Sequence, residues 1–535
     1  MKHTPYHALV PIPDGTLYDL VERSARRMPD GLAIDSYGTT FTYSELLYRI
    51  DSAVSALYHL GVRAGEHVLL LLPNLPQAVI LFYAINRLGA TNVIMHPACS
   101  SGEVEEIIRK WDCSAVFVTA HAASLSGEWL QRFKLEGRRV VAIGPTTLED
   151  AMPEGDFWRL GRNRLDCAVG NVEKSRASVV LFSGGTSGGN KAVLLSDRNL
   201  NAAAVLTAAA SGQADLTGLS ILAMMPMFHG FGLGVGIHTA LANGATSVLL
   251  MGYSGKDLAA TIRRRNLHYL PGVPTMFAKM ISDPELQSVD LSSLKGVFCG
   301  GDHLPARLEN AVNDYLTRRG SSVFVRQGYG LTEAVSVNLL TSYEHPEFGK
   351  IGYPLPNVLA KIVDVDTERE LPRGQEGELC LSGPTVMLGY DDTELTAQTL
   401  RRHADGRVWL HTGDVAVEEE SGCFRFVQRQ KLVLISSGYN VYPSQIEEAL
   451  EGLPFVREAC VIGVPDAVKG QKICLFLSAE AEVKAAVASH LSKRIPKYAL
   501  PHRYVFLPAL PRTRIGKVDY SALERLATID KDSIS

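Results

Sequence analysis

The sequence lacks the features that mark several classes of protein. It has no long basic run, and its formal net charge is −4 over 535 residues, so it gives no reason to expect a nucleic-acid partner. Its apolar runs, such as Val68–Leu72, are far too short to span a bilayer, and its first residues contain no apolar signal core. We therefore expect a soluble, cytoplasmic protein with no transmembrane segment.

The cysteines are scattered along the chain. The eight of them form no Cys-x-x-Cys pair. This pattern argues against a structural zinc site and against a disulfide framework. Reduced and mostly buried thiols are the expected state.

The composition, 46% hydrophobic and 21% charged, is that of a globular protein, and 535 residues are too many for one core. Over residues 68–143, strand-like and helix-like segments alternate, which predicts βαβ units and a mostly parallel sheet. Residues 349–425 carry short strands and many turns, which is typical of a β-rich subdomain. Residues 144–170 look irregular, and Thr42 to Glu45 is only a partial helix-capping signal.

A loop of small and hydroxylated residues, Ser183–Lys191, lies between two apolar runs, Ala177–Phe182 and Ala192–Leu195. The pattern predicts a strand, a phosphate-binding loop and a second strand. Glycines let the backbone turn its N–H groups toward an anion, hydroxyl groups add donors, and Lys191 adds a positive charge. This combination favours a polyphosphate ligand.

Other interpretations of this loop are less favoured, although a Gly-rich hairpin without chemistry stays open for the loop alone. A Walker A loop requires Gly-Lys-Ser/Thr, whereas Lys191 follows Asn190 and precedes Ala192. The glycines have the wrong spacing for a dinucleotide fingerprint. Gly185–Gly189 matches the nucleophile elbow of a hydrolase, but that elbow leads into a helix, and here a strand-like run follows.

Two more polar loops follow strand-like segments. Cys299–Asp302 follows Leu294–Phe298, and Gln327–Ala334 follows Val323–Arg326. Because ligands of open α/β sheets collect at the carboxyl ends of strands, both loops are candidate ligand-binding segments. Glu333 offers a hard oxygen ligand of the kind that Mg²⁺ prefers.

The loop and the segment after it, through Ser196–Leu200, resemble the signature of the adenylate-forming superfamily, which contains acyl- and aryl-CoA ligases, luciferases and peptide-synthetase adenylation domains. With the segments that contain Tyr329–Glu333, Thr412–Asp414, Arg429 and Pro511–Lys517, five motifs stand in the expected order from about residue 15 to 525. Four positions depart from the usual pattern: Gly184 for serine, Asn190 for proline, Ala192 for glycine and Asp197 for histidine.

The resemblance implies an α/β fold in two parts. Residues 1–430 would form a large ATP- and acid-binding domain with a β-rich subdomain, and residues 431–535 a small mobile α+β lid that rotates at a hinge, Lys431. The implied catalytic residues are Lys517, Thr186, Lys191, Glu333 and His229, with Glu333 as the Mg²⁺ ligand and His229 beside the acid pocket. The expected nucleotide-binding residues are Ser183, Thr186, Ser187, Gly188, Lys191, Gly300, Gly301, Gln327, Gly328, Tyr329, Gly330, Thr332, Asp414, Arg429, Lys431 and Gly438.

The expected function is that of an acyl- or aryl-CoA ligase with ATP, Mg²⁺ and coenzyme A as cofactor or co-substrates. A carboxylic acid would be activated as acyl-AMP and transferred to the thiol. Two alternatives stay open, a ligase that loads a separate carrier protein and a non-catalytic binding relative. The identity of the acid and the formation of a homodimer are also left open by the sequence.

Overall fold

The computed structural model describes residues 6, 8–119, 133, 136–145, 151–162, 176–184, 190–213, 215–436, 439–466, 470–512 and 518–529. Two compact units divide the chain. The first comprises Met1–Leu304, Leu308–Ala360 and Leu381–Leu410, and the second comprises Pro305–Arg307, Lys361–Cys380 and His411–Ser535. Both units combine helices with sheets, which confirms the predicted α/β class. The predicted hinge at Lys431 stays a prediction.

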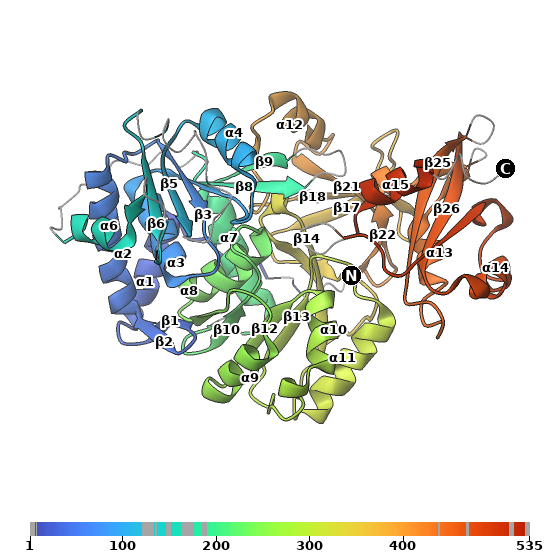
Figure 1. The fold of residues 1–535 in the computed structure, drawn as a ribbon, viewed down its shortest axis with the longest axis horizontal. Helices are drawn as coiled ribbons and strands as arrows, with labels where there is room; N and C mark the ends of the chain where they lie inside the picture. Colours follow the sequence, from blue (N-terminus) through green and yellow to red (C-terminus); the bar gives the residue numbers. More distant parts are fainter. Residues whose placement is uncertain are drawn as a thin grey trace. The chain divides into compact units, whose positions relative to one another are not determined.

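An eight-stranded sheet of the first unit has the order β19-β9-β8-β4-β3-β5-β6-β7 (Figure 1). Strands β3 to β7 run parallel to their neighbours, and β8 runs parallel to β4, as the alternation of strands and helices predicts. Helix α4 covers one face, where Val104 and Ile107 pack against Val93 and Val116. The bounds are β3 (His67–Leu71), α3 (Pro76–Leu88), β4 (Thr91–Ile94), α4 (Ser101–Trp111), β5 (Cys113–Thr119), β6 (Arg139–Ile143), β7 (Met152–Pro153), α6 (Glu154–Leu160), β8 (Val179–Gly184), β9 (Asn190–Leu195) and β19 (Gly389–Tyr390).

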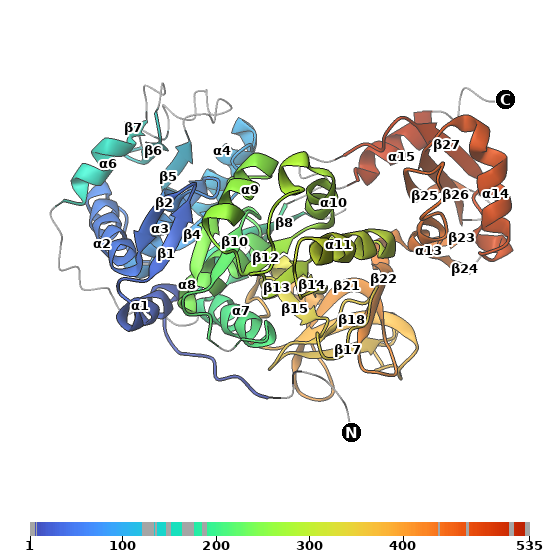
Figure 2. The same cartoon turned by 90° about the horizontal axis from the view of Figure 1, so that it is seen from below.

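A nine-stranded sheet of the same unit has the order β16-β15-β14-β13-β12-β10-β11-β1-β2. Figure 2 shows α9, α10 and α11 on one side of its central strands, with α7 and α8 on the other. The face toward α9–α11 carries a large apolar cluster that includes Leu222, Val248, Leu270 and Val297. The bounds are β1 (Leu32–Ser36), β2 (Thr39–Thr42), α7 (Asp197–Ala210), β10 (Ser220–Ala223), α8 (Ala240–Ala242), β11 (Thr246–Leu249), α9 (Gly255–Arg264), β12 (Tyr269–Gly272), α10 (Pro274–Ser282), β13 (Gly296–Cys299), α11 (Ala306–Arg318), β14 (Val325–Gly330), β15 (Val337–Leu340) and β16 (Tyr353–Pro354).

Four helix starts in the first unit are fixed by reciprocal side-chain caps. In α2 (Tyr43–Leu60), the Thr42 hydroxyl accepts from the backbone N–H of Glu45, and the Glu45 carboxylate accepts from that of Thr42. The same capping box begins α1 (Leu17–Arg27), α4 and α7. Each box satisfies two backbone donors that a helix start leaves without an intrahelical partner. The signal at Thr42 is therefore complete, not partial as the sequence suggested.

The segment that looked irregular in sequence also contains regular structure. Within residues 144–170, the described part forms β7 and the helix α6. The Glu154 carboxylate accepts from the Trp158 indole N–H at 3.0 Å and from the backbone N–H of Gly144 at 2.8 Å. The helix is only seven residues long, so its apolar period is too short to read from sequence alone.

Most of the short strands predicted over residues 349–425 form a five-stranded sheet, in the order β17-β18-β21-β20, with β22 paired to β21. Strand β21 runs antiparallel to both β20 and β22. The bounds are β17 (Leu359–Val363), β18 (Glu376–Ser382), α12 (Thr393–Thr399), β20 (Leu400–Arg402), β21 (Val408–Glu418) and β22 (Phe424–Arg429).

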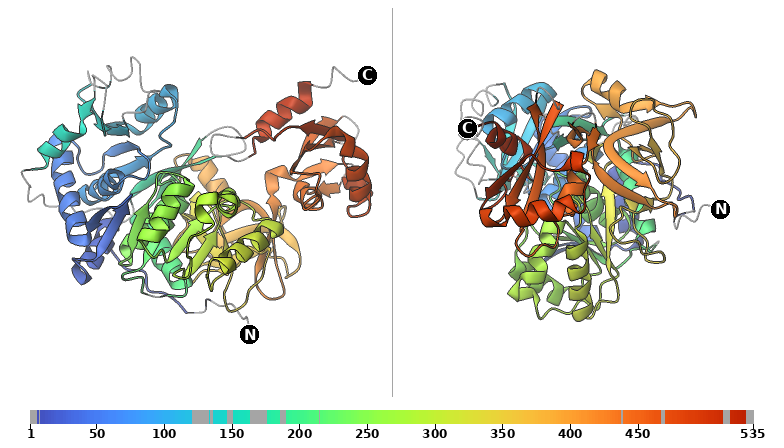
Figure 3. Two further views of the ribbon diagram at one scale, coloured as in Figure 1. Left: turned by 60° about the horizontal axis from the view of Figure 1, so that its bottom comes forward. Right: turned by 90° about the vertical axis from the view of Figure 1, so that its right-hand side faces the viewer.

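The C-terminal residues of the second unit form another five-stranded sheet, in the order β24-β23-β26-β25 with β27 beside β26. These residues are drawn in orange to red in Figure 3. Ile446 of α13 and Leu491 of α14 pack on one face, and Leu523 of α15 packs on the other. The bounds are β23 (Leu434–Ser436), β24 (Tyr439–Val441), α13 (Pro443–Glu448), β25 (Glu458–Asp466), β26 (Gly470–Ser478), α14 (Lys484–Ser492), β27 (Arg503–Leu507) and α15 (Tyr520–Ile529).

The N-terminal arm is fastened to the first unit far along the chain. The Asn357 side chain accepts from the backbone N–H of Val10 at 2.9 Å and donates to its carbonyl at 2.8 Å. Asn357 itself has a φ of 62°, a left-handed conformation that Asn adopts more readily than most residues. One amide thus pairs both backbone groups of Val10, as a neighbouring strand would. No described helix is long and apolar enough to cross a membrane.

Candidate active site

The predicted phosphate loop joins two antiparallel strands, as expected. Strands β8 and β9 pair Ser183 with Lys191 and Gly184 with Asn190. The three loop residues expected to contact phosphate, Thr186, Ser187 and Gly188, lie outside the described residues. The structure therefore gives the positions of the two strand ends from which the loop begins and returns.

The strand end at Ser183 lies beside Glu333, the predicted metal ligand. The Ser183 hydroxyl donates to Glu333 Oε1 at 2.8 Å, and the Tyr390 hydroxyl donates to the same oxygen at 2.8 Å. The ring of Tyr390 also lies 5.4 Å from the Lys191 ammonium. Two sequence motifs 150 residues apart thus meet around one carboxylate.

The backbone around Glu333 is fixed by a tight turn. The backbone N–H of Ser336 donates to the carbonyl of Ala334 at 2.8 Å, and the residue between them, Val335, has φ 65° and ψ −64°. This is a γ-turn with positive φ, a strained conformation for a β-branched residue. The carbonyl of Val335 approaches Gly230 so closely that a Cβ added there would lie 1.6 Å from it. Glycine at position 230 is therefore required by the close approach of this turn.

The other predicted nucleotide-binding residues of the first unit lie at or just beyond strand ends. Gly300 and Gly301 follow β13, whereas residues 327–330 are the last four of β14. These two strands are parallel neighbours, so their carboxyl ends open on the same sheet edge. Tyr329 and Thr332 are partly exposed there, and Gln327 is buried. The arrangement brings both predicted loops together beside Glu333.

His229 precedes an eight-residue π-helix, Gly232–Thr239. π-helical turns occur often at functional sites. The glycines of this segment do not leave open volume beside them. A Cβ on Gly232 would lie 2.2 Å from the carbonyl oxygen of Pro226, and one on Gly236 would lie 3.0 Å from Ala223. Backbone fills the space beside these glycines.

The second unit brings Asp414 and Arg429 together. They are paired residues of β21 and β22, and Arg429 Nε lies 2.9 Å from Asp414 Oδ1. This distance makes the contact an ion pair. Its geometry is not that of a hydrogen bond, and Asp414 Oδ1 accepts no hydrogen bond from the described residues. Gly413, with φ 68°, sits within the strand in a conformation that favours glycine. Lys431 is exposed in a 3₁₀ turn, whereas Gly438 and Lys517 lie outside the described residues.

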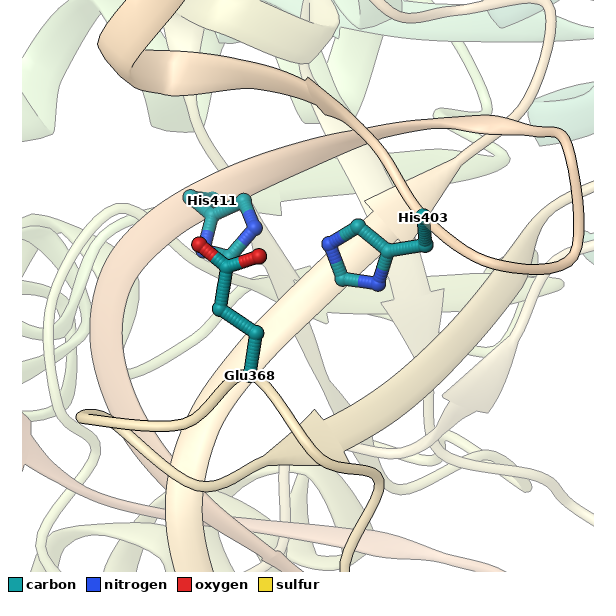
Figure 4. A group of neighbouring side chains, drawn as sticks. All are labelled: Glu368, His403 and His411. Atoms are coloured by element: carbon teal, nitrogen blue, oxygen red, sulfur yellow. The ribbon is translucent and has the colours of Figure 1, made fainter.

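A separate group of potential metal ligands is shown in Figure 4. Glu368, His403 and His411 each offer a ligand atom, and these atoms lie within 4.8 Å of one another. His411 is buried, and its Nδ1 lies 2.8 Å from a carboxylate oxygen of Glu378, whose other oxygen accepts from the backbone N–H of Gly413. We assign this group no part in the chemistry below.

Two of the departures from the usual loop pattern have structural roles. Asp197 is buried, accepts from the Asn86 side chain at 2.6 Å and from the backbone N–H of Leu17 at 3.3 Å. It therefore joins the starts of α1 and α7, and burial raises its pKa. Ala192 is buried in the apolar cluster under α4, so its methyl group faces the core.

Tyr390 is the residue of this site that sequence reasoning missed. It stands alone after Gly389 without a motif that points to chemistry. Its position depends on the pairing of β19 with β9, where Tyr390 lies opposite Val193. A pairing between segments almost two hundred residues apart leaves no local signal, so only an alignment of relatives or a structure could have found it.

Comparisons with known proteins match nearly the whole chain. The model of the AMP-binding enzyme family matches residues 21–391, and that of the AMP-binding enzyme C-terminal domain matches residues 445–517. The chain is 29% identical to a long-chain-fatty-acid–CoA ligase of Bacillus subtilis, covering 95% of this chain and 94% of that protein. It is 31% identical to a feruloyl-CoA synthase of an Amycolatopsis species, covering 93% and 96%.

A propanoyl:CoA ligase of Rhodococcus jostii, which acts on a methyl-dioxo-octahydroindenyl acid, is 32% identical over 93% of this chain and 96% of its own. Among solved structures, ATP-bound MatB from Rhodopseudomonas palustris superimposes with a TM-score of 0.83 at 24% identity, covering 96% of this chain and 99% of that one. The comparison with this solved structure supports the fold.

Proposed function

Because the chain belongs to the AMP-binding enzyme family, within the acyl- and aryl-CoA synthetase branch of the adenylate-forming superfamily, we propose that it is an ATP-dependent acid–thiol ligase. A carboxylate oxygen of the acid attacks the α-phosphorus of ATP and pyrophosphate leaves, which gives acyl-AMP. The sulfur of coenzyme A then attacks the acyl carbon, AMP leaves, and the thiol proton is lost. The observation that carries this proposal is the meeting of Ser183, Lys191 and Glu333 at one strand end.

The first step places negative charge on a five-coordinate phosphorus, so it requires fixed donors and cations. Lys191 supplies a cation at the base of the phosphate loop. Thr186 and Ser187, together with the loop N–H groups, would bind the leaving pyrophosphate. Lys517 would lie between the acid's carboxylate and the α-phosphate when the predicted lid, residues 431–535, turns its loop toward the site.

A magnesium ion fits the donor set around Glu333. In the described part of the chain, both hydroxyl groups that reach this carboxylate donate to Oε1, so Oε2 is the oxygen that a cation would take. Carboxylate oxygen is the ligand that Mg²⁺ prefers, and Mg²⁺ commonly binds through one or two carboxylates plus substrate phosphates. When bound, the ion would neutralise charge on the phosphate oxygens.

We assign the remaining motifs to the base, the α-phosphate and the ribose of ATP. Tyr329 offers a flat face to adenine and Thr332 a hydroxyl to the α-phosphate. Asp414 can accept from both ribose hydroxyls, and the guanidinium of Arg429 lies 2.9 Å from one of its oxygens. His229 is proposed to position the acid at the start of the π-helix.

Coenzyme A is the preferred acceptor because the curated relatives described above are named as CoA ligases or synthases. A carrier protein that brings its own thiol is the alternative for the second step. The acids in those names are a long-chain fatty acid, ferulic acid and a bicyclic propanoic acid. Because these acids differ widely, the acid that this chain activates has to be identified by experiment.

The test is acid-dependent exchange of labelled pyrophosphate into ATP across a panel of aromatic, medium-chain and long-chain acids. The thioester formed with coenzyme A is then identified by mass. Exchange without thioester would favour the carrier-protein alternative. Exchange with no acid of the panel would favour a non-catalytic relative.

Lys517 tests the division of labour between the two steps. Lys517→Ala should lower acyl-AMP formation by about 10²-fold or more, because one preorganised contact to the developing charge is lost. It should still convert supplied acyl-AMP to thioester. Equal loss in both steps would contradict a role confined to adenylation.

A further inference from the structure

Tyr390 makes two different contacts in the site from one rigid side chain. It is 6% exposed, its hydroxyl donates to Glu333 Oε1 at 2.8 Å, and its ring face lies 5.4 Å from Lys191 Nζ. The first contact is a charge-assisted hydrogen bond, and the second is a cation–π contact. One residue thus touches both the proposed metal ligand and the proposed phosphate-binding lysine.

The backbone fixes where this side chain begins. Strand β19 pairs antiparallel with β9, so that Tyr390 lies opposite Val193. Lys191 is two residues from Val193 on the same strand, and therefore shares the face of the sheet with it and with Tyr390. The backbone N–H of Tyr390 also donates to the Thr396 hydroxyl at 2.8 Å.

The contacts to Glu333 are asymmetric. Ser183 and Tyr390 both donate to Oε1. They come from β8 and β19, the two strands on either side of β9, which carries Lys191. The backbone of Glu333 is fixed as well, because its carbonyl accepts from the backbone N–H of Met387 at 2.9 Å. Met387 lies three residues before Tyr390, so one short segment contacts both the main chain and the side chain of Glu333.

We propose that Tyr390 is a positioning residue with two roles. Its hydroxyl sets the orientation of the Glu333 carboxylate for a divalent cation, and its ring holds the Lys191 ammonium against the ring face until a triphosphate binds. The hydroxyl fixes which carboxylate oxygen faces the cation. The ring stabilises the ammonium without neutralising it, so the charge stays available to phosphate. This inference rests on the proposed function for its substrate, ATP.

Two substitutions separate the two contacts. Tyr390→Phe removes the hydroxyl and keeps the ring, whereas Tyr390→Leu removes both. Tyr48→Phe is the matched control, because Tyr48 is 61% exposed on α2. Thermal unfolding of each full-length variant identifies any that fail to fold.

The readout that does not depend on turnover is Mn²⁺ affinity, measured by electron paramagnetic resonance in the presence of a non-hydrolysable ATP analogue. Tyr390→Phe should weaken Mn²⁺ binding about tenfold, the scale of a lost hydrogen bond to a charged group. It should raise the Mg²⁺ concentration for half-maximal pyrophosphate exchange by a similar factor and leave the KM for ATP at saturating Mg²⁺ within about twofold. Tyr390→Leu should raise that KM in addition.

Ser183→Ala sharpens the test because it removes the other donor to the same oxygen. If the two hydroxyls share the positioning of one carboxylate, the double variant with Tyr390→Phe should lose more Mn²⁺ affinity than the product of the single losses. Parental Mn²⁺ affinity in a folded Tyr390→Phe protein would overturn the inference, as would an equal shift in Tyr48→Phe. Failure of the proposed function differs, because the parental protein itself would then show no exchange with any acid.

Discussion

The two carboxylates assigned to the nucleotide are stabilised in different ways. Glu333, in the first unit, is contacted by two neutral hydroxyl groups at one oxygen. Asp414, in the second unit, is 1% exposed and lies 2.9 Å from the guanidinium of Arg429. The hydroxyls orient Glu333 without neutralising its negative charge, and no cationic side chain forms an ion pair with it in the described part of the chain, whereas Arg429 pairs with Asp414.

The difference indicates two kinds of ligand. A carboxylate whose charge is left uncompensated attracts a cation, because ion binding supplies the missing positive charge. A carboxylate with a resident cation gains little from a second one and is suited to accept hydrogen bonds from neutral hydroxyl groups, such as those of a ribose. The following predictions test this contrast.

The largest effect is expected at Glu333. Glu333→Gln keeps an acceptor for the hydroxyls but removes the charge, so acyl-AMP formation should fall roughly 10²–10³-fold, as when one preorganised electrostatic contact is removed. Pyrophosphate exchange as a function of Mg²⁺ concentration measures it. Glu344→Gln, at an exposed glutamate of the same unit, is the control. A parental rate and Mg²⁺ dependence in Glu333→Gln would show that this carboxylate binds no metal.

The second effect concerns the proposed hinge in the second unit. Lys431 lies in a 3₁₀ turn, whose φ is near the value that proline fixes, so Lys431→Pro should favour the present conformation of the turn. If that conformation is the adenylating one, pyrophosphate exchange should survive within about tenfold. Thioester formation from supplied acyl-AMP should fall by about 10²-fold, the scale expected when a catalytic constellation is misplaced. Parental rates in both steps would exclude a hinge at this residue.

A smaller effect is expected at Asp414, where the ligand is a neutral hydroxyl. Asp414→Ala should abolish any preference of the parental enzyme for ATP over 2′-deoxy-ATP, a change of about tenfold in relative kcat/KM. Arg429→Gln should raise the KM for ATP by less, because the Arg429 side chain is 51% exposed and its pairing is partly screened by solvent. The control is Asp366→Ala, at an exposed aspartate. An undiminished preference in folded Asp414→Ala would place the ribose elsewhere.

The smallest effect involves Glu447, a third carboxylate, whose side-chain partner is the Cys460 thiol. Burial raises its pKa to about 7, and the backbone N–H of Val461 donates to it at 2.7 Å. Between its ordinary pKa of 4.5 and about 7 the folded state binds a proton that the unfolded state releases, so stability falls as the pH rises through this window.

Thermal unfolding between pH 5 and 8 measures this change. Glu447→Gln cannot ionise, and its transition temperature should therefore depend less on pH by a few degrees. Glu448→Gln, at the exposed neighbour on the same helix, should keep the parental dependence. An equal pH dependence in Glu447→Gln and the parent would assign it to other groups.

Much of the fold was predictable, and the reason is local. The alternation of strands and helices over residues 68–143 and the hairpin around Ser183–Lys191 are both encoded in neighbouring residues, and both are confirmed. The pairing of Asp414 with Arg429 joins two motifs only fifteen residues apart. Such features depend on period and turn chemistry within one segment.

The contacts that sequence reasoning missed depend on distant pairings or on packing. Tyr390 reaches Glu333 only because β19 pairs with β9. The π-helix after His229 could not be read from its glycines, because backbone fills the space that their missing side chains leave. In the sequence Asp197 was only a departure from the usual histidine, whereas in the structure it joins the starts of two helices. For Tyr390 and Asp197 the partner lies far along the chain.

The arm at Val10 bears on how the protein is handled in the laboratory. Asn357 binds both backbone groups of that residue, and the Tyr6 hydroxyl donates to the carbonyl of Thr341 at 3.2 Å. A truncation that begins after Val10 would leave the Asn357 amide without the partners it contacts here. Affinity tags joined directly before Tyr6 would also disturb the contacts that Tyr6 and Val10 make with Thr341 and Asn357. Expression designs should therefore retain residues 6–10 and separate any upstream fusion from them by a flexible linker.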